Sequence, residues 1–509
     1  MTLEQVYLLL AAGAATALVS VTAARIAARA GLPVLLAYLA VGLLLGEDGL
    51  GLRFDDVALT QALATAALAV ILVEGGLTTN LTHVRPVLAP ATVLATAGVL
   101  ISVGVTAVAL HLLLDVPWQL ALLLGAIVSS TDAAAVFSVL RTLPLPRRLG
   151  SLVEAESGLN DPAAIILVIA FSATALDEIT PWRLLGQMTY QLAGGAVVGL
   201  ALGGLGAWFL RRLTLPSSGL YPIATFATAL LAFAIAGLAQ ASGFLAAYLA
   251  GLVLGNSGLA HRRATTSFAE GMAWIAQIGL FVMLGLLADP DELGTAILPA
   301  LGVGFVLLLL ARPISVLLSL LPFRVSLREQ LLLSWAGLRG AVPIVLSTFP
   351  VVAGVPGSEQ LFNIVFVLVV VFTILQAPML RWLVPRLGLS TDRVGADVEV
   401  EAAPLENMSA DLLEVTVEPG SRLHGVYIQE LRLPLPAAIT LIVRDGTAFV
   451  PGPDTRLRTG DRLFMLTTPP VRQEAERRLR AIARAGRLAR WHGETGGAEG
   501  RTPPPGRPR

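Results

Sequence analysis

Charged and polar side chains gather in one short stretch of an otherwise apolar chain, between residues 125 and 162. They include Asp132, Glu154, Glu156, Asn160 and Asp161. An ionised carboxylate in the middle of a lipid bilayer costs at least a few kcal/mol, so intramembrane carboxylates are functional candidates by default. Several of them in one place predict a site that handles ions.

The spacing of these residues predicts how the site is built. On a helix, Glu154, Ser157 and Asp161 stand at i, i+3 and i+7 and share one face. Pro162 cannot donate a backbone hydrogen bond, which leaves the carbonyl of Gly158 free. A carboxylate, a hydroxyl and a free carbonyl are hard oxygen ligands of the kind that suit alkali cations rather than soft metals. Competition between a proton and a cation for Asp161 is the minimal mechanism of an exchanger.

Three further acidic residues have a functional and a structural interpretation. The chain is expected to unwind at Thr131 and Asp132, and Asp132 either caps the half-helix that follows or also contacts the ion. Glu74, in the run ILVEGGL, is expected to be functional rather than structural. Glu154 is expected near the cytoplasmic edge of the membrane, where a charge costs little.

Buried charges of opposite sign are expected to pair. An unpaired Glu156 and an unpaired Arg339 at mid-depth would both be costly, so these two are predicted to form a structural ion pair. Arg312, which precedes Pro313, is a competing partner for Glu156, or a residue whose charge reaches toward the membrane surface.

The composition places this site in a membrane protein. Of the 509 residues, 55% are hydrophobic and 14% are charged, and the mean hydropathy is +0.77, whereas soluble proteins carry roughly 25% charged residues. Lys+Arg and Asp+Glu both number 35, which excludes a strongly basic nucleic-acid binder. The chain has no cysteine, so disulfides and thiolate metal sites are excluded, and no cofactor is expected.

Apolar windows of about 20 residues predict an all-α membrane domain of thirteen transmembrane helices over residues 1–386. Their approximate limits are 6–27, 33–46, 57–78, 88–114, 118–140, 150–175, 187–211, 220–239, 243–258, 268–288, 295–320, 328–350 and 361–384. Arginines follow the odd-numbered segments, and acidic residues lie in the other loops. Because basic loops stay in the cytoplasm, the N-terminus is predicted outside a bacterial inner membrane and the C-terminus inside.

An internal repeat is visible in the predicted helices. Residues 37–40 and 247–250 both read AYLA, at an offset of seven helices. An odd offset makes the two units inverted, as in many secondary transporters with a site at the midplane. The same offset pairs the segment of Thr131 with the segment of Gly337–Gly340, and both are expected to be discontinuous. Small residues at 195, 199 and 203 predict a close helix contact, within one protomer or between two.

The composition changes after Arg386. Residues 387–410 are predicted to be a polar linker. Residues 411–483 alternate as strands over 413–417, 439–444 and 462–466, separated by turn residues, and predict a small α+β cytoplasmic domain. A basic helix is predicted over 471–487, and residues 488–509 are predicted to be a disordered tail.

Three motifs resemble the signatures of a known family. SSTDAAAV, ESGLNDPAA and GLRGAVP, in this order, are similar to helices 5, 6 and 12 of the cation/proton antiporter superfamily, in its electroneutral Na+/H+ or K+/H+ exchanger branch. The resemblance covers about residues 1–390. It implies a homodimer in which a core bundle moves against a dimerisation domain.

Carried over position by position, the resemblance also implies roles for single residues. It makes Asp161 the carrier of the ion and the proton. It makes Ser157 and Thr131 coordinating groups, with Asp132 and Glu74 around them. It implies that Asn160 ties helix 6 to the unwound segment, and that Glu156 and Arg339 form the core ion pair.

Residues 411–483 resemble the C-terminal half of a regulator-of-K+-conductance (TrkA-type) domain. The resemblance rests on Gly425, Leu433-Pro434, Ile442-Val443-Arg444, Pro451 and Gly460-Asp461. No glycine-rich dinucleotide fingerprint precedes it, so a nucleotide-binding half is not expected. The resemblance implies regulation by a small cytoplasmic ligand or a dimer contact.

These observations predict a transporter and not an enzyme. The expected activity is monovalent cation/proton antiport, with K+ favoured and Na+ as the alternative. A gated cation channel fits less well, because a channel needs a series of weak sites rather than one isolated buried carboxylate. The expected partners are small cations, protons, the lipid bilayer and a second copy of the chain, with no nucleic acid.

Overall fold

A computed structural model describes most of the chain: residues 2–29, 33–47, 49–52, 54, 56–131, 145–173, 180–389, 400–405 and 410–486. The chain divides into two units, Met1–Ser390 and Thr391–Arg509. Each is described by itself below.

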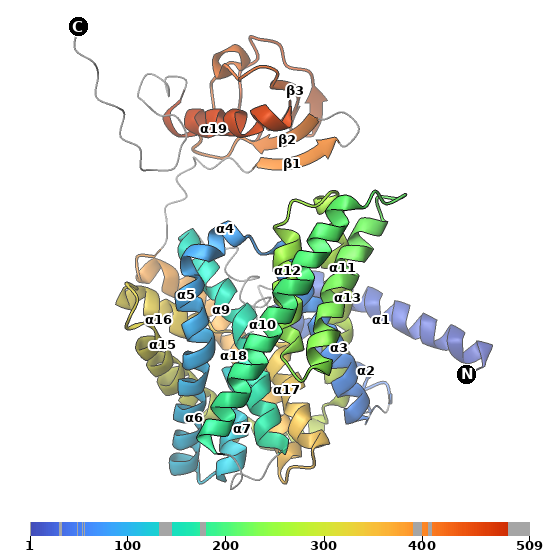
Figure 1. Cartoon of the computed structure of the whole chain (residues 1–509), viewed down its shortest axis with the longest axis vertical. Coiled ribbons are helices and arrows are strands. Elements are labelled where there is room, and N and C mark those ends of the chain that lie inside the picture. Colours follow the sequence, from blue (N-terminus) through green and yellow to red (C-terminus); the bar gives the residue numbers. More distant parts are fainter. Residues whose placement is uncertain are drawn as a thin grey trace. The chain divides into compact units, whose positions relative to one another are not determined.

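The first unit is built from helices (Figure 1), because apolar segments in lipid must satisfy their backbone hydrogen bonds internally. The helices before residue 131 are α1 (Leu3–Arg29), α2 (Val34–Leu45), α3 (Val57–Thr78), α4 (Leu81–Val84), α5 (Leu88–Val93), α6 (Val99–Leu114) and α7 (Trp118–Ser129). Those after residue 145 are α9 (Arg147–Ala173), α10 (Pro181–Arg212), α11 (Leu220–Leu238), α12 (Gly243–Gly255), α13 (Arg262–Leu287), α14 (Pro290–Val306), α15 (Arg312–Leu320), α16 (Leu327–Ala336), α17 (Ala341–Val352) and α18 (Ser358–Arg386).

The lengths of these helices make the chain a multi-pass membrane protein. In the described ranges, eight helices are long and apolar enough to cross a bilayer, and the bent pair α16–α17 makes up to nine. The helices α2, α7 and α12 are apolar but shorter. A mostly helical membrane domain is therefore confirmed, whereas the count of thirteen stays a prediction.

Two of the long helical segments contain a π-helical turn, which the sequence analysis did not predict. One turn, Leu94–Gly98, lies between α5 and α6, and the other, Leu307–Ala311, lies between α14 and α15. The two turns pack crosswise, because the first contacts α15 and the second contacts α6. Such turns insert an extra residue into a helix and occur frequently at functional sites.

Glycines allow several helices to approach backbone to backbone. Gly42 of α2 and Gly285 of α13 face each other, and Gly76 of α3 faces Gly251 of α12. Any side chain at these positions would collide with the opposite backbone. The predicted small-residue contact of α10, at residues 195, 199 and 203, packs against α12 of the same chain.

The second unit is a five-stranded antiparallel sheet in the order β1-β2-β5-β3-β4, with one long helix. Its elements are β1 (Val400–Leu405), β2 (Ala410–Thr416), β3 (Ala438–Arg444), β4 (Thr447–Phe449), β5 (Arg462–Thr467) and α19 (Pro469–Ala485). Alternate side chains of β2 and β5, such as Leu413 and Met465, form a core with Leu479 and Ile482 of α19.

One boundary of the second unit differs from the predicted one. Strand β1 lies inside the stretch 387–410 that was predicted to be a linker, and it pairs with β2 in antiparallel register from Val400↔Val415 to Leu405↔Ala410. The sequence VEAAPL contains a proline and two alanines, which have weak strand preference, so pairing with β2 explains the strand better than its composition does. The predicted tail 488–509 and residues 390–399 lie outside the described residues.

Candidate ion-binding site

Helix α7 ends inside the protein, next to the middle of α9. Its last helical residue is Ser129, and Ser130 has an extended backbone with ψ of 139°. The Ser130 hydroxyl donates a hydrogen bond to Asp161 Oδ1 at 2.6 Å. Helix α9 continues through Pro162 and presents its polar face to this end. The predicted unwinding of the segment is therefore seen up to Thr131, and Asp132 lies outside the described residues.

Thr131 joins the two segments at the same point. Asn160 Nδ2 donates to Thr131 Oγ1 at 2.6 Å, and the hydroxyls of Thr131 and Ser157 lie 3.0 Å apart. Asp161 is only 6% exposed, and the other three side chains are buried more deeply. The predicted residues Thr131, Ser157, Asn160 and Asp161 are thus brought together in one buried cluster of oxygen-bearing groups.

This cluster can exchange one positive charge for another. The Asp161 carboxylate can bind a proton or a cation, and the hydroxyls of Ser130, Thr131 and Ser157 supply neutral oxygens nearby. Asn160 is buried beside the carboxylate, and its Oδ1 has no hydrogen-bond partner among the described residues. An amide cannot titrate, so Asn160 offers an oxygen but no second exchangeable charge.

The second predicted discontinuity is also present. Helices α16 and α17 are bent by 56° across the break Gly337–Gly340. From this break, Arg339 Nε donates to the carbonyl of Val128 at 3.1 Å, close to the end of α7, and its Nη1 donates to the Gly337 carbonyl. Carbonyls at a helix C-terminus lack partners within the helix and attract positive charge. Arg339 therefore links the two interrupted helices.

The predicted ion pair between Glu156 and Arg339 is corrected by the structure. Glu156 pairs with Arg312 instead, with 2.6 Å between Oε1 and Nη2, and both side chains are buried. Arg312 is the first residue of α15, directly after a π-helical turn. The physical reason is that the end of α7 leaves a backbone carbonyl that Arg339 satisfies, so Arg312 is the cation left for Glu156.

Gly337 allows these groups to meet. A Cβ atom at this position would lie 2.8 Å from Arg339 Nη1, 3.1 Å from Arg312 Nε and 3.2 Å from Thr131 Cγ2. The break in the helix, both buried arginines and Thr131 therefore share one point of contact that only glycine can occupy without displacing a neighbour.

The remaining predicted carboxylates among the described residues are Glu154 and Glu74. Glu154, one turn before Ser157 on α9, is partly buried and accepts a hydrogen bond from Thr79 Oγ1 at 3.0 Å. Glu74 is partly buried on α3, and its backbone carbonyl accepts a bond from the Thr78 hydroxyl at 3.0 Å. A role for Glu74 in binding the ion stays a prediction.

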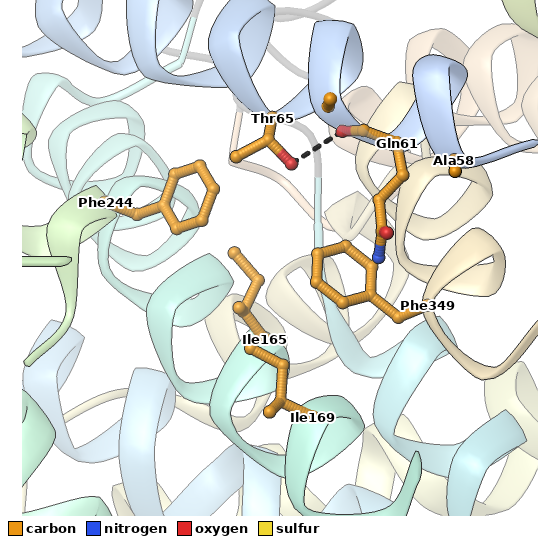
Figure 2. A pocket seen from close by; sticks show the side chains of 8 residues that line it. Ala58, Gln61, Thr65, Ile165, Ile169, Phe244 and Phe349 are labelled. Atoms are coloured by element: carbon orange, nitrogen blue, oxygen red, sulfur yellow. Dashed lines mark hydrogen bonds between the residues drawn. The ribbon is translucent and has the colours of Figure 1, made fainter. Parts of the chain in front are cut away.

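A cavity of about 390 Å³ begins one turn beyond Asp161 on α9. Figure 2 shows Ile165 and Ile169 of α9 lining it together with Phe244 of α12 and Thr65 of α3. Ala58, Gln61 and Phe349 are the other labelled residues of its wall. The Thr65 hydroxyl donates to the backbone carbonyl of Gln61 at 2.7 Å. The cavity lies on the opposite side of Asp161 from Glu154, because α9 runs from Glu154 through Asp161 to Ile169.

Sequence reasoning missed Ser130 and Thr79 as partners of the carboxylates. Ser130 stands in the run Ser129-Ser130-Thr131, and a second hydroxyl just before an expected helix break was a usable signal. Thr79 gave no signal, because it is more than seventy residues from Glu154 in the sequence.

The second unit carries a polar contact of its own. The Arg444 guanidinium donates to both oxygens of Asp461 at 2.7 Å, and the backbone N–H of Arg458 donates to Oδ2 at 2.7 Å. Burial alone would raise the pKa of Asp461, but these hydrogen bonds and charges together hold its pKa below the usual value. Two of the residues that suggested a TrkA-type domain, Arg444 and Asp461, thus pair with each other.

Comparisons with known proteins agree with both units. The family model described as "Sodium/hydrogen exchanger, transmembrane" matches residues 14–386, and a TrkA-C domain model matches residues 412–480. The K(+)/H(+) antiporter NhaP2 of Shewanella sp. (strain ANA-3) is 39% identical over 472 residues, which cover 89% of this chain and 80% of that protein. The K(+)/H(+) antiporter NhaP of Alkalimonas amylolytica is 38% identical over 444 residues, covering 84% and 76%.

A solved structure has the same fold. The sodium proton antiporter MjNhaP1 of Methanocaldococcus jannaschii superposes with a TM-score of 0.65 at 21% identity, covering 75% of this chain and 99% of that one. At this identity the likeness concerns the fold alone.

Proposed function

Because this chain belongs to the sodium/hydrogen exchanger family, we propose that it exchanges K+ for protons across a bacterial inner membrane, with Asp161 as the group that binds either ion. The observation that carries the proposal is the buried contact of Asp161 with Ser130, beside Thr131, Ser157 and Asn160. Relatives named as K(+)/H(+) antiporters support K+ as the cation.

The proposed exchange uses one carboxylate. When Asp161 is protonated, its charge is neutralised by the proton. When it loses the proton, a cation takes its place, and the Ser130 hydroxyl turns from donating a hydrogen bond to offering a lone pair. Since Asn160 does not titrate, one proton is exchanged for one cation and the cycle is electroneutral. Asp132 and Glu74 are proposed as further residues around this site.

Na+ is the alternative cation. The description of the family model and the name of the sodium proton antiporter MjNhaP1 both refer to sodium. Hydroxyl, amide and carboxylate oxygens bind either ion, so the ligand types named above do not decide between the two.

We further propose thirteen transmembrane segments arranged as an inverted repeat, with the N-terminus outside. Two features support the repeat. The π-helical turns begin at Leu94 and Leu307 and lie in the fourth and eleventh predicted segments, which are seven apart. The same offset of seven pairs α2 with α12 and α3 with α13 as repeat equivalents. The glycine contact of α2 with α13 in one half therefore corresponds to the glycine contact of α12 with α3 in the other. The arginine-rich loops support the orientation.

A homodimer and a regulatory ligand complete the proposal. The likeness of the fold to a known antiporter is compatible with the dimer that the family resemblance implies. The TrkA-C match over 412–480 supports regulation by a small cytoplasmic ligand, or through contact between two copies of this domain.

The test replaces Asp161 with asparagine, which removes the titrating charge and preserves the volume. Purified protein in liposomes that contain a pH-sensitive dye is given K+, Na+ and Li+ in turn. The Asp161→Asn variant should show no dye response, whereas Asp115→Asn, which changes an exposed loop carboxylate, should respond as the wild type does. Exchange by Asp161→Asn at a near wild-type rate would show that the carrier lies elsewhere. The order of the three ions then decides between K+ and Na+.

A further inference from the structure

Helix α12 places two aromatic side chains on the two sides of Asp161. Tyr248 and Phe244 are four residues apart and share one face of α12. Phe244 lines the cavity that begins at Ile165. Tyr248 lies against Gly158, one turn before Asp161 on α9. Along α9, the Asp161 carboxylate thus lies between Gly158, which contacts the Tyr248 ring, and Ile165, which lines the cavity with Phe244.

The contact of Tyr248 with Gly158 is tight. A Cβ atom on Gly158 would lie 2.9 Å from Cε2, 3.0 Å from Cζ and 3.3 Å from the hydroxyl oxygen of Tyr248. The tyrosine is only 4% exposed. The ring therefore occupies the space that a side chain at position 158 of α9 would fill.

Tyr248 is also held in place from the other directions. Its backbone carbonyl lies against Gly76 of α3, where a side chain would collide with it. The ring end lies close to Thr79 and Glu154, and the Thr79 hydroxyl donates to Glu154 at 3.0 Å. Along α9 the order is then Glu154, the Tyr248 ring over Gly158, Asp161, and the cavity beyond Ile165.

We propose that the Tyr248 ring, seated on Gly158, is the barrier that separates Asp161 from the Glu154 side of the membrane, and that Glu154 with Thr79 is the polar station beyond it. This assignment rests on the proposed role of Asp161. An aromatic ring packed on a bare backbone leaves no room for water, and an ion without its hydration shell does not cross an apolar layer at low cost. Access from the Glu154 side then requires α9 and α12 to shift, which unseats the ring.

Removing the barrier should uncouple transport. In liposomes without an exchangeable cation, wild-type protein should hold a pH gradient. Tyr248→Ala should dissipate it about tenfold faster, which corresponds to about 1.4 kcal/mol off the barrier. Tyr248→Phe retains the ring and should hold the gradient as the wild type does. If Tyr248→Phe leaks as fast as Tyr248→Ala, the ring is not the barrier.

A glycine substitution tests the same contact without removing any side chain. Gly158→Ala places a methyl group against the ring and should give a leak between those of wild type and Tyr248→Ala. The matched control is Gly150→Ala on the same helix, where nothing lies within 4 Å of the added atom, and it should not leak. Folded Tyr248→Ala and Gly158→Ala proteins that both hold the gradient would overturn the proposal, as would an equal leak in Gly150→Ala.

The experiments distinguish a failure of the proposed barrier from a failure of the proposed carrier Asp161. If Asp161→Asn still exchanges cations, the proposed function of Asp161 fails, while a leak specific to Tyr248→Ala and Gly158→Ala still supports a barrier at this level. If Asp161→Asn abolishes exchange and neither Tyr248→Ala nor Gly158→Ala leaks, the carrier stands and the barrier fails.

Discussion

Glu156 shows what a single residue's sequence context can and cannot predict. Its burial and need for a cation follow from the sequence, because an uncompensated charge in an apolar helix is costly. Arg312 and Arg339 were both available to it. The choice depends on the carbonyl of Val128, which Arg339 satisfies and which becomes available only because α7 ends at Ser129. The spacing of the two arginines in the sequence does not predict that geometry.

The ion pair leads to a stability prediction. Glu156→Gln or Arg312→Gln alone leaves a buried charge uncompensated and should destabilise the protein by about 3–5 kcal/mol. The double variant should lose much less than the sum, as measured by thermal unfolding in detergent. The control cycle of Glu156→Gln with Arg339→Gln should show weaker coupling, because Arg339 donates to backbone carbonyls rather than to Glu156. Coupling in the control cycle and none in the first would restore Arg339 as the partner.

The second unit should lose stability in acid through Asp461. A carboxyl whose pKa is lowered in the folded state stabilises it above the unfolded pKa of about 3.9, and the contribution is lost as the pH falls through the folded pKa. Hydrogen exchange of residues 410–486, corrected for intrinsic rates, should therefore increase as the pH falls below about 4. Asp461→Asn should flatten this dependence and weaken the unit at neutral pH. A pH dependence unchanged in Asp461→Asn would contradict the assignment.

At the scale of elements, the interruptions of helices differed in how well the sequence predicted them. The break Gly337–Gly340 was predictable, since glycine and proline weaken a helix. The π-helical turns at Leu94–Gly98 and Leu307–Ala311 were not, because the sequences LATAG and LLLLA fit an ordinary helix. Their position depends on how α6 and α15 pack across each other. Strand β1 was missed for a similar reason, since its pairing with β2 outweighs its own residues.

The crowded break in α16–α17 predicts a sensitive glycine. Gly337→Ala should strongly reduce exchange, because the added methyl displaces Arg339, Arg312 or Thr131. The protein should still insert into the membrane. Gly271→Ala on α13, where the added atom meets nothing within 4 Å, is the control. Liposome exchange rates at equal protein content measure the difference. Wild-type activity in Gly337→Ala would mean that the three side chains move apart freely.

At the scale of the whole molecule, the chain consists of a membrane unit that ends at Ser390 and a smaller sheet-containing unit that follows it in the sequence. The division between the two was predictable from the change in composition after Arg386. The second unit begins earlier than the sequence suggested, because it includes β1. Its interior is formed by its own residues, such as Leu413, Met465 and Ile482.

This division predicts the result of a truncation. A chain that ends at Leu389 should insert, exchange the same cations and keep their order of affinity, because the proposed site lies on α7, α9 and the α16–α17 break. Its response to pH or to a cytoplasmic ligand should change, since a regulatory unit acts by favouring one conformation of the transporter. Dye-based exchange in liposomes at several pH values measures both properties. A folded truncation with altered selectivity and unaltered regulation would place the second unit in the transport path.

The burial of Asp161 has a consequence for the proposed exchange cycle, in which this carboxylate carries either ion. With 6% of its surface exposed, the carboxylate has little water to stabilise a net charge, and an isolated buried charge is strongly disfavoured. The proton-loaded and cation-loaded forms are both neutral overall, whereas the empty form is not. The empty carrier is therefore the one species that the apolar surroundings penalise during the conformational change. Obligatory exchange then follows from electrostatics, because a carrier that releases one ion must bind the other before it can return.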